Sequence, residues 1–241
     1  MKKVLITGGT GAIGQEIIKV LSSQNKYDIS FTYTHSKKEA NLLAKRYKIK
    51  AIYIKDSNIK KLPNNFDVVI NNAGIGAFGD LTHTVDDKLM KQAFEINLML
   101  PFKIIKLVLP HMMKQKWGRI LNISSINGLF GPEYTVAYNS TKFALNGLTR
   151  TVAREYAKYN ITSNSVCPGA VGEKGMAITA AKFYSQNEEE FKEEVDAYNR
   201  VTPIGRTATT TEIANTVAFL ISDQASYING VCLPVDGGRL A

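Results

Sequence analysis

Tyr138 and Lys142 are the pair of side chains in this sequence whose spacing most directly indicates chemistry. Residues four positions apart lie on the same face of a helix, so the ammonium group would stand beside the phenol. A neighbouring positive charge favours the phenolate and lowers the pKa of a tyrosine from its usual value of about 10. Tyr138 could then give a proton to a carbonyl oxygen during reduction, or take one from an alcohol during oxidation.

A glycine-rich turn near the N-terminus predicts a nucleotide site. The segment after the first apolar run reads Thr7-Gly8-Gly9-Thr10-Gly11-Ala12-Ile13-Gly14 and opens a helical pattern. Glycines allow a tight turn, a close approach of the backbone to a pyrophosphate and close packing of helix on strand, while the helix N-terminus attracts the anion. Because a lone glycine cluster also marks ordinary turns, the prediction depends on the strand before it and the helix after it.

The segment after the second predicted strand discriminates between NAD(H) and NADP(H). An NAD-preferring site places an acid about 20 residues beyond the last glycine, on the ribose 2′-hydroxyl. The segment here reads Tyr33-Thr34-His35-Ser36-Lys37-Lys38, and the first acid is Glu39. Hydroxyls and cations suit a 2′-phosphate, so we expect NADP(H). The alternative is that the two lysines are only the solvated start of the next helix.

The elements that must position these residues alternate between short apolar runs and longer helical patterns. The strand candidates are 2–7, 28–34, 50–55, 67–71, 118–124, 161–167 and 230–235. Most are dense in Val and Ile, which is typical of strands covered on both faces. Residues 138–158 instead repeat apolar side chains every three or four positions. This order predicts an α/β fold, a Rossmann-type doubly wound parallel sheet of about seven strands with helices on both faces.

Length and composition limit the class of protein. The chain has 241 residues, 44% hydrophobic and 21% charged, which suits one globular domain over residues 1–241. No apolar run is long enough to span a bilayer and the N-terminus does not read as a signal peptide, so we expect a cytoplasmic protein without a membrane partner. Cys167 and Cys232 lack metal-ligand spacing, so we expect no metal site.

The formal net charge of +9 favours anionic ligands or partners. Lysines and arginines are scattered along the chain rather than gathered in a stripe or an arm, so we do not expect nucleic acid as a partner. A phosphate-rich cofactor and an acidic carrier protein are both compatible with this charge.

Further segments make the chain resemble the short-chain dehydrogenase/reductase family in its compact, single-domain form. They are Asn71-Asn72-Ala73-Gly74, Asn97, Ser124-Ser125, Tyr138-Asn139-Ser140-Thr141-Lys142, Pro168-Gly169 and Asp236-Gly237-Gly238. The resemblance covers residues 3–238, and Ser125 stands thirteen residues before Tyr138. It implies an NADP(H)-dependent oxidoreductase that interconverts a ketone and an alcohol.

The resemblance also implies the roles of individual residues. The catalytic set would be Asn97, Ser125, Tyr138 and Lys142. Ser125 would hydrogen-bond the reacting oxygen, Lys142 would also hold the nicotinamide ribose, and Asn97 would anchor a water chain that returns the proton. Hydride transfer itself belongs to the cofactor. The implied cofactor-binding residues are Gly8, Thr10, Ala12, Ile13, Gly14, Thr34, His35, Ser36, Asp56, Asn72, Ala73, Gly74, Tyr138, Lys142, Pro168, Gly169 and Val171.

Two positions depart from the family's pattern. Ala12 stands where the short-type turn has its middle glycine. Glu173 stands four residues after Gly169, where the family often has a threonine that grips the cofactor, and the nearest hydroxyl downstream is Thr179. Residues 170–202, which include an acidic helix-like run, would form a substrate lid.

The C-terminal third resembles the 3-oxoacyl-acyl-carrier-protein reductases. The matching segments are Val201-Thr202-Pro203-Ile204-Gly205-Arg206, Glu212-Ile213-Ala214 and Phe219-Leu220-Ile221-Ser222-Asp223. We therefore expect a 3-oxoacyl thioester or a similar β-keto substrate. An acyl carrier protein would dock at lysines flanking the cleft, with Lys114, Lys116 and Lys158 as candidates.

Two other functions remain open from the sequence, and an oligomeric state is also expected. A small-molecule ketone, sugar or polyol dehydrogenase is the main alternative, because fold and motifs do not fix the substrate. A non-catalytic, cofactor-sensing protein is a third possibility. The resemblance implies a homo-oligomer, a tetramer or a dimer, in which helices near 97–114 and 138–158 pair across an interface.

Overall fold

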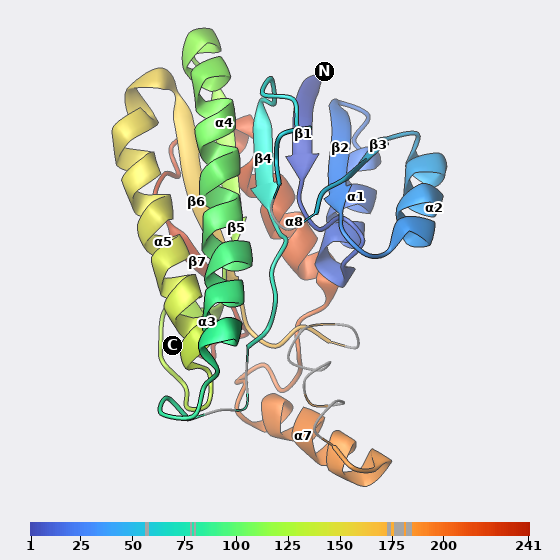
Figure 1. Ribbon diagram of the computed structural model, residues 1–241, viewed down its shortest axis with the longest axis vertical. Coiled ribbons are helices and arrows are strands. Elements are labelled where there is room, and N and C mark those ends of the chain that lie inside the picture. The colour runs from blue at the N-terminus through green and yellow to red at the C-terminus, as the bar shows by residue number, and fades with distance from the viewer. Residues whose placement is uncertain (56–57, 78, 80, 173–174, 176–180, 182–184) are drawn as a thin grey trace.

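A seven-stranded parallel sheet forms the centre of the computed structural model, which describes residues 1–55, 58–77, 79, 81–172, 175, 181 and 185–241 (Figure 1). The strand order is β3-β2-β1-β4-β5-β6-β7. The strands are β1 (Lys2–Ile6), β2 (Tyr27–Tyr33), β3 (Lys50–Tyr53), β4 (Val68–Asn71), β5 (Gly118–Ile123), β6 (Ile161–Pro168) and β7 (Cys232–Val235). The predicted doubly wound parallel sheet is therefore confirmed, and no predicted strand boundary is wrong by more than two residues.

Helices cover both faces of this sheet. The α-helices are α1 (Ala12–Ser22), α2 (Lys37–Tyr47), α3 (Asp87–Phe94), α4 (Leu100–Gln115), α5 (Val136–Tyr156), α7 (Glu188–Arg200) and α8 (Thr210–Leu220). Shorter turns are the π-helical η1 (Glu95–Met99) and the 3-10 helices η2 (Ile126–Gly128), η3 (Ala157–Tyr159) and η4 (Asp223–Ala225). Within the described part of the chain, no helix combines the length and hydrophobicity needed to cross a membrane.

Alternating strand residues divide the core into two layers. Val4 and Ile6 of β1 pack with α1, α2 and α8 on one face of the sheet. Leu5, between them, packs with α4 and α5 on the other face. Figure 1 shows α4 and α5 in front of the sheet and α8 behind it. Successive side chains of a strand point to opposite faces, which explains why the strands read as unbroken apolar runs in the sequence.

The sheet order places a crevice at one edge. β1 pairs with β2 on one side and with β4 on the other, so the chain leaves the carboxyl ends of β1 and β4 toward opposite faces. Ligands of open α/β sheets bind at such a switch point, outside the carboxyl ends of the strands. In Figure 1 this edge points toward α7 and the start of α5.

Candidate active site

The glycine-rich turn between β1 and α1 leaves no room for larger side chains at Gly8, Gly9 and Gly14. Gly8 has a φ of +63°, and a Cβ there would lie 3.0 Å from the Cα of Ala73. A Cβ on Gly14 would clash with the carbonyl oxygen of Gly8. The N-terminus of α1, at Ala12, has no side-chain cap. A bare helix N-terminus above a tight turn suits a pyrophosphate.

The alanine at position 12 does not disturb this turn. Gly11 is the extended N-cap of α1, and Ala12 opens the helix with ordinary helical geometry. Ile13 packs partly against the core, and the Thr10 carbonyl accepts a hydrogen bond from Gln15 Nε2 at 2.9 Å. The structure thus brings Gly8, Thr10, Ala12, Ile13 and Gly14 together where β1 meets α1.

Asn72 holds the glycine-rich turn onto the end of β4. Its Nδ2 donates to the carbonyl oxygens of Thr7 at 3.0 Å and Gly8 at 3.1 Å. The Thr7 hydroxyl oxygen in turn accepts from the backbone N–H groups of Asn72 and Ala73, both at 2.9 Å. Asn72 therefore shapes the cofactor crevice through the turn. Sequence reasoning missed Thr7, although a threonine directly before the glycine run was the available signal.

The loop after β2 presents hydroxyls and cations to solvent. Thr34, His35 and Ser36 are exposed, and Ser36 is the N-cap residue of α2. The first two residues of α2, Lys37 and Lys38, are also exposed. No acid precedes Glu39 in this loop, so its chemistry matches the sequence analysis. Asp56, predicted at the end of the neighbouring strand, lies outside the described residues.

Three predicted catalytic side chains meet just beyond the carboxyl end of β5. Ser125 follows this strand and its side chain hydrogen-bonds Tyr138 of α5. Lys142, one helical turn after Tyr138, donates from Nζ to the carbonyl oxygen of Ile123 at 2.9 Å. Its ammonium lies 5.4 Å from the centroid of the Tyr138 ring. All three side chains are buried, with at most 9% of each residue exposed.

Burial sets the protonation of this cluster, and the prediction that the pKa of Tyr138 is lowered is wrong. Burial raises the pKa of Tyr138 to about 12, and the hydrogen bond from Ser125 only partly opposes it. Burial also lowers the pKa of Lys142 to about 8. Removal from water is the largest cause of both shifts, because the charged form of each group loses its hydration. Tyr138 is thus a protonated phenol near neutral pH.

Asn97 lies in the π-helical turn η1, fully buried. Its Oδ1 accepts from the Ile75 N–H at 2.8 Å, and its Nδ2 donates to the Ile75 carbonyl oxygen and to Thr141 Oγ1, both at 3.1 Å. A Cβ on Gly74 would lie 3.2 Å from Asn97 Oδ1 and 3.7 Å from Lys142 Nζ. Gly74 therefore lies between the Asn97 and Lys142 side chains, close to both. π-Helical turns of this kind are frequent at functional sites.

The end of β6 carries the remaining cofactor-binding predictions. Pro168 closes the strand, and the Gly169 N–H donates to the carbonyl oxygen of Val235 at 3.0 Å. The Val171 side chain is buried in the core layer that also contains residues of α1 and α8. Glu173 and Thr179, where the sequence departs from the family, lie outside the described residues.

The start of the predicted lid, residues 170–202, is joined to the chain that follows the lid at a short parallel bridge beside this strand. Val171 pairs with Ala208, where the Ala208 N–H donates to Ala170 at 2.9 Å and the Gly172 N–H donates to Ala208 at 2.7 Å. Between these ends, α7 buries none of its residues. The bridge therefore holds the start of the lid segment, and the chain just beyond its end, next to the carboxyl end of β6.

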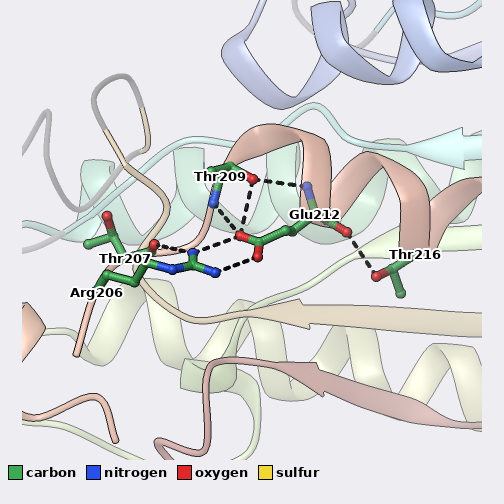
Figure 2. Close-up of polar contacts among 5 residues, drawn as sticks. All are labelled: Arg206, Thr207, Thr209, Glu212 and Thr216. Carbon is green, nitrogen blue, oxygen red and sulfur yellow. Dashed lines mark hydrogen bonds and ion pairs between the residues drawn. The ribbon is translucent and has the colours of Figure 1, made fainter. Parts of the chain in front are cut away.

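An ion pair fixes the residues that follow the bridge (Figure 2). Arg206 donates to both carboxylate oxygens of Glu212, at 2.7 and 3.0 Å. Glu212 also accepts from the Thr209 N–H and hydroxyl, while the Glu212 N–H donates to Thr209 Oγ1, which makes a capping box at the start of α8. The Arg206 guanidinium holds the pKa of Glu212 down at about 2, so the pair stays ionised at neutral pH.

The lysines predicted to flank the cleft lie elsewhere in this chain. Lys114 and Lys116 end α4 just before β5 begins, and Lys158 lies in η3 just before β6 begins. All strands run parallel, so these positions are at the amino edge of the sheet, opposite Ser125 and Tyr138. The prediction is wrong because these lysines precede their strands and so lie at the amino ends, whereas the cleft lies at the carboxyl ends.

Comparisons with known proteins agree with this architecture. The family described as enoyl-(acyl carrier protein) reductase matches residues 54–239, and the semialdehyde dehydrogenase NAD-binding domain matches residues 3–95. The chain is 32% identical over 260 residues to the 3-oxoacyl-[acyl-carrier-protein] reductase of Aquifex aeolicus, covering 98% of this chain and 96% of that protein.

Solved structures give the same result. Actinorhodin polyketide ketoreductase with NADPH superimposes with a TM-score of 0.88 at 28% identity, and levodione reductase with a TM-score of 0.88 at 27% identity. Each comparison covers 99% of this chain and 97% of the other. With its seven-stranded parallel sheet, its glycine-rich turn and its Ser125, Tyr138 and Lys142 cluster, the chain belongs to the short-chain dehydrogenase/reductase family of oxidoreductases and resembles the 3-oxoacyl-acyl-carrier-protein reductases.

Proposed function

We propose that this protein is an NADPH-dependent ketone reductase whose substrate is a 3-oxoacyl thioester. The observation that carries the proposal is the buried contact of Ser125 with Tyr138, beside Lys142, at the same edge of the sheet as the glycine-rich turn. The resemblance to a 3-oxoacyl-acyl-carrier-protein reductase and to a polyketide ketoreductase supports a β-keto substrate. Residues 1–241 would act as one domain, with residues 170–202 as the lid.

The side chains divide the work of reduction among themselves. NADPH, when bound, would supply the hydride. Tyr138, protonated near neutral pH, donates its proton to the carbonyl oxygen of the substrate. The Ser125 hydroxyl hydrogen-bonds the same oxygen as negative charge develops there. The Lys142 ammonium, 5.4 Å from the phenol ring, stabilises the phenolate that remains.

The loop after β2 supports NADPH over NADH. Its exposed Thr34, Ser36 and Lys37 supply donors to a 2′-phosphate, and no carboxylate repels it. We expect kcat/KM with NADPH to exceed that with NADH at least about tenfold, or about 1.4 kcal/mol. Thr34→Asp should narrow or reverse the preference, whereas Ser226→Asp, an exposed control remote in sequence from this loop, should not. A wild-type preference for NADH would overturn the cofactor assignment.

A substrate screen tests the reaction itself. NADPH oxidation is followed with acyl thioesters, cyclic diketones, quinones and sugars. The proposal expects the highest kcat/KM on a 3-oxoacyl thioester. The likeness to levodione reductase favours a small-ketone reductase as the second candidate, and the highest kcat/KM on a cyclic diketone would select it. NADPH binding without turnover on the whole panel would point to a cofactor-sensing protein.

We further propose that two copies pair through α4 and α5. Three large apolar side chains of η1, α4 and α5 are exposed to solvent, namely Met99 (36%), Phe102 (41%) and Phe143 (47%). A two-fold interface pairs the same surface of both copies, and an axis perpendicular to α4 sets the two α4 helices antiparallel. Lys114 and Lys116 of one copy would then lie near the catalytic edge of the other, where an acidic carrier protein could meet them.

Two measurements separate these ideas. Phe102→Glu with Phe143→Glu should shift the molar mass by sedimentation toward that of a monomer, because charges would be buried in the interface. Lys114→Glu with Lys116→Glu should raise KM for a carrier-linked substrate and spare a small thioester, with the difference fading as salt screens the charges. Equal KM changes for the two substrates would argue against carrier docking.

A further inference from the structure

The hydroxyl of Thr141 lies between Asn97 and Tyr138, inside the motif that contains the catalytic tyrosine and lysine. Thr141 is fully buried on α5. Its Oγ1 is 2.7 Å from the carbonyl oxygen of Tyr138 and 3.1 Å from Nδ2 of Asn97. A chain of two hydrogen bonds therefore joins η1 to the catalytic turn of α5.

The direction of each hydrogen bond in this chain is determined by its partners. The Tyr138 carbonyl can only accept, so the single hydroxyl proton of Thr141 points to it. Thr141 Oγ1 must then accept, which assigns a donating N–H of Asn97 to it. The other N–H of Asn97 goes to the Ile75 carbonyl, and the Ile75 N–H goes to Asn97 Oδ1. No other arrangement satisfies all four groups.

We propose that Thr141 is a positioning residue. It fixes the position of Tyr138 at the crevice by linking the Tyr138 backbone to the Asn97 side chain through hydrogen bonds. The proposal rests on the proposed reduction by Tyr138. Both N–H groups of Asn97 are used by Ile75 and Thr141, so the Asn97 side chain acts as a bracket between the segment after β4 and α5. Tyr138 and Lys142 are both on α5, so a shift of α5 against η1 would change the distance from Tyr138 to a bound carbonyl.

Thr149 supplies a matched control on the same helix. It too is fully buried, donates from Oγ1 to a backbone carbonyl one turn earlier, and accepts from an asparagine, Asn122 Nδ2 at 2.8 Å. Its remaining partner is Ser165 on β6, at 2.7 Å. Thr149 thus loses the same kind of bond when replaced by valine, about three turns away from Tyr138.

The test compares Thr141→Val, Thr141→Ser and Thr149→Val by kcat, KM and pH profile on a 3-oxoacyl thioester. Thr141→Val should lower kcat about ten- to a hundredfold, as expected for a small misplacement of the acid, with KM for NADPH changed less than about twofold. Thr141→Ser should restore kcat to within about threefold. Thr149→Val should lower the melting temperature as much as Thr141→Val does, and keep kcat.

Three outcomes would overturn the proposal. They are wild-type kcat in Thr141→Val, equal losses of kcat in Thr141→Val and Thr149→Val, and no recovery in Thr141→Ser. If Thr141→Val does not fold, Thr141→Ala replaces it, with the same expected split. If the wild-type enzyme reduces no carbonyl, the proposed function fails separately. The NMR signal of isotope-labelled Tyr138 Cζ then decides, and it should move in the Thr141 variant only.

Discussion

The two edges of the sheet each bury a cation, and they bury it differently. At the carboxyl edge, Lys142 donates to the carbonyl oxygen of Ile123 and stands beside the Tyr138 ring. At the amino edge, Arg119 has a side chain that is 2% exposed. Its guanidinium donates to the carbonyl oxygens of Gly118 and Asn160 and to Asp223, and it lies 4.4 Å from the centroid of the Trp117 ring.

The chemistry of the two cations explains the difference. Burial lowers the pKa of Lys142 to about 8, within reach of physiological pH. Burial also lowers the pKa of Arg119, but Asp223 opposes it and a guanidinium keeps its proton under all ordinary conditions. The Lys142 ammonium, which can lose its charge, lies beside the Tyr138 phenol. The Arg119 guanidinium, which stays charged, lies where several acceptors need donors. A buried cation whose protonation can change is suited to proton chemistry, whereas a buried guanidinium that stays charged is suited to a structural role.

The largest expected effect is a loss of kcat from a substitution at the carboxyl edge. Tyr138→Phe removes the proton donor and keeps the ring, so kcat should fall about 10²- to 10⁴-fold. The melting temperature should stay near that of the wild-type protein, because the ring and its packing are kept. A steady-state assay and a thermal melt measure both quantities. A variant that retains most of its kcat would contradict the role of Tyr138.

The next effect concerns the amino edge and falls on stability alone. Arg119→Met removes the donors that serve the Gly118 and Asn160 carbonyl oxygens, which are then left without these bonds. We expect the free energy of unfolding to drop by about 2–4 kcal/mol, from urea denaturation followed by the fluorescence of the single tryptophan, Trp117. The kcat of the folded variant should equal that of the wild type. A loss of kcat at full folding would show that this edge is not purely structural.

The pH profile sharpens the comparison with a smaller effect. Lys142 is charged below its lowered pKa of about 8 and neutral above it, so support for the phenolate disappears as pH rises. We expect kcat/KM for ketone reduction to fall toward about tenfold per pH unit above pH 8, or about 1.4 kcal/mol per unit. Lys142→Arg, if active, should show no such fall. A wild-type profile that stays flat until Tyr138 itself titrates, near 12, would exclude Lys142 as the group.

The smallest effect is expected at the outer end of the amino-edge cluster. Asp223 is bonded to Arg119 at 3.3 Å and to Trp117 Nε1 at 3.2 Å, but its side chain is 82% exposed. Solvent screens such a pair, so Asp223→Asn should change the free energy of unfolding by less than about 1 kcal/mol. Urea denaturation of Asp223→Asn beside Arg119→Met gives the comparison. A cost equal to that of Arg119→Met would mean that the ion pair, and not the carbonyl bonds, stabilises this edge.

Much of the fold could be predicted because buried parallel strands and amphipathic helices have direct sequence patterns. The fourth strand was expected at 67–71 and is Val68–Asn71, and the helix expected at 138–158 is Val136–Tyr156. The differences lie at the ends of the strands and helices, where hydrogen bonds and not hydrophobic periodicity set the boundary. Asp67, for example, was expected in the fourth strand but lies just before it, where its carboxylate accepts from the Lys3 N–H at 2.8 Å and from Gln115 Nε2 at 2.7 Å.

The site was only partly predictable, because some of its contacting residues are close in the sequence and others are far apart in it. The spacing of Tyr138 and Lys142 is local, so a helix brings them together whatever surrounds it. The contacts of Thr7 with Asn72 and of Asn97 with Thr141 join residues 65 and 44 positions apart, and no spacing rule applies to them. The three lysines near the ends of α4 and α5 were assigned to the wrong edge for the same reason.

The amino-acid sequence by itself determined the parallel sheet, the glycine-rich turn and the residue types that meet beyond β5, since these follow from local periodicity and spacing. Only the tertiary structure decided the protonation of the site. The pKa of Tyr138 depends on how much water the surrounding elements exclude, and burial there raises it even though an ammonium stands nearby. It also decided which end of the sheet carries each charge, because that depends on the direction of packed strands and not on distance along the chain.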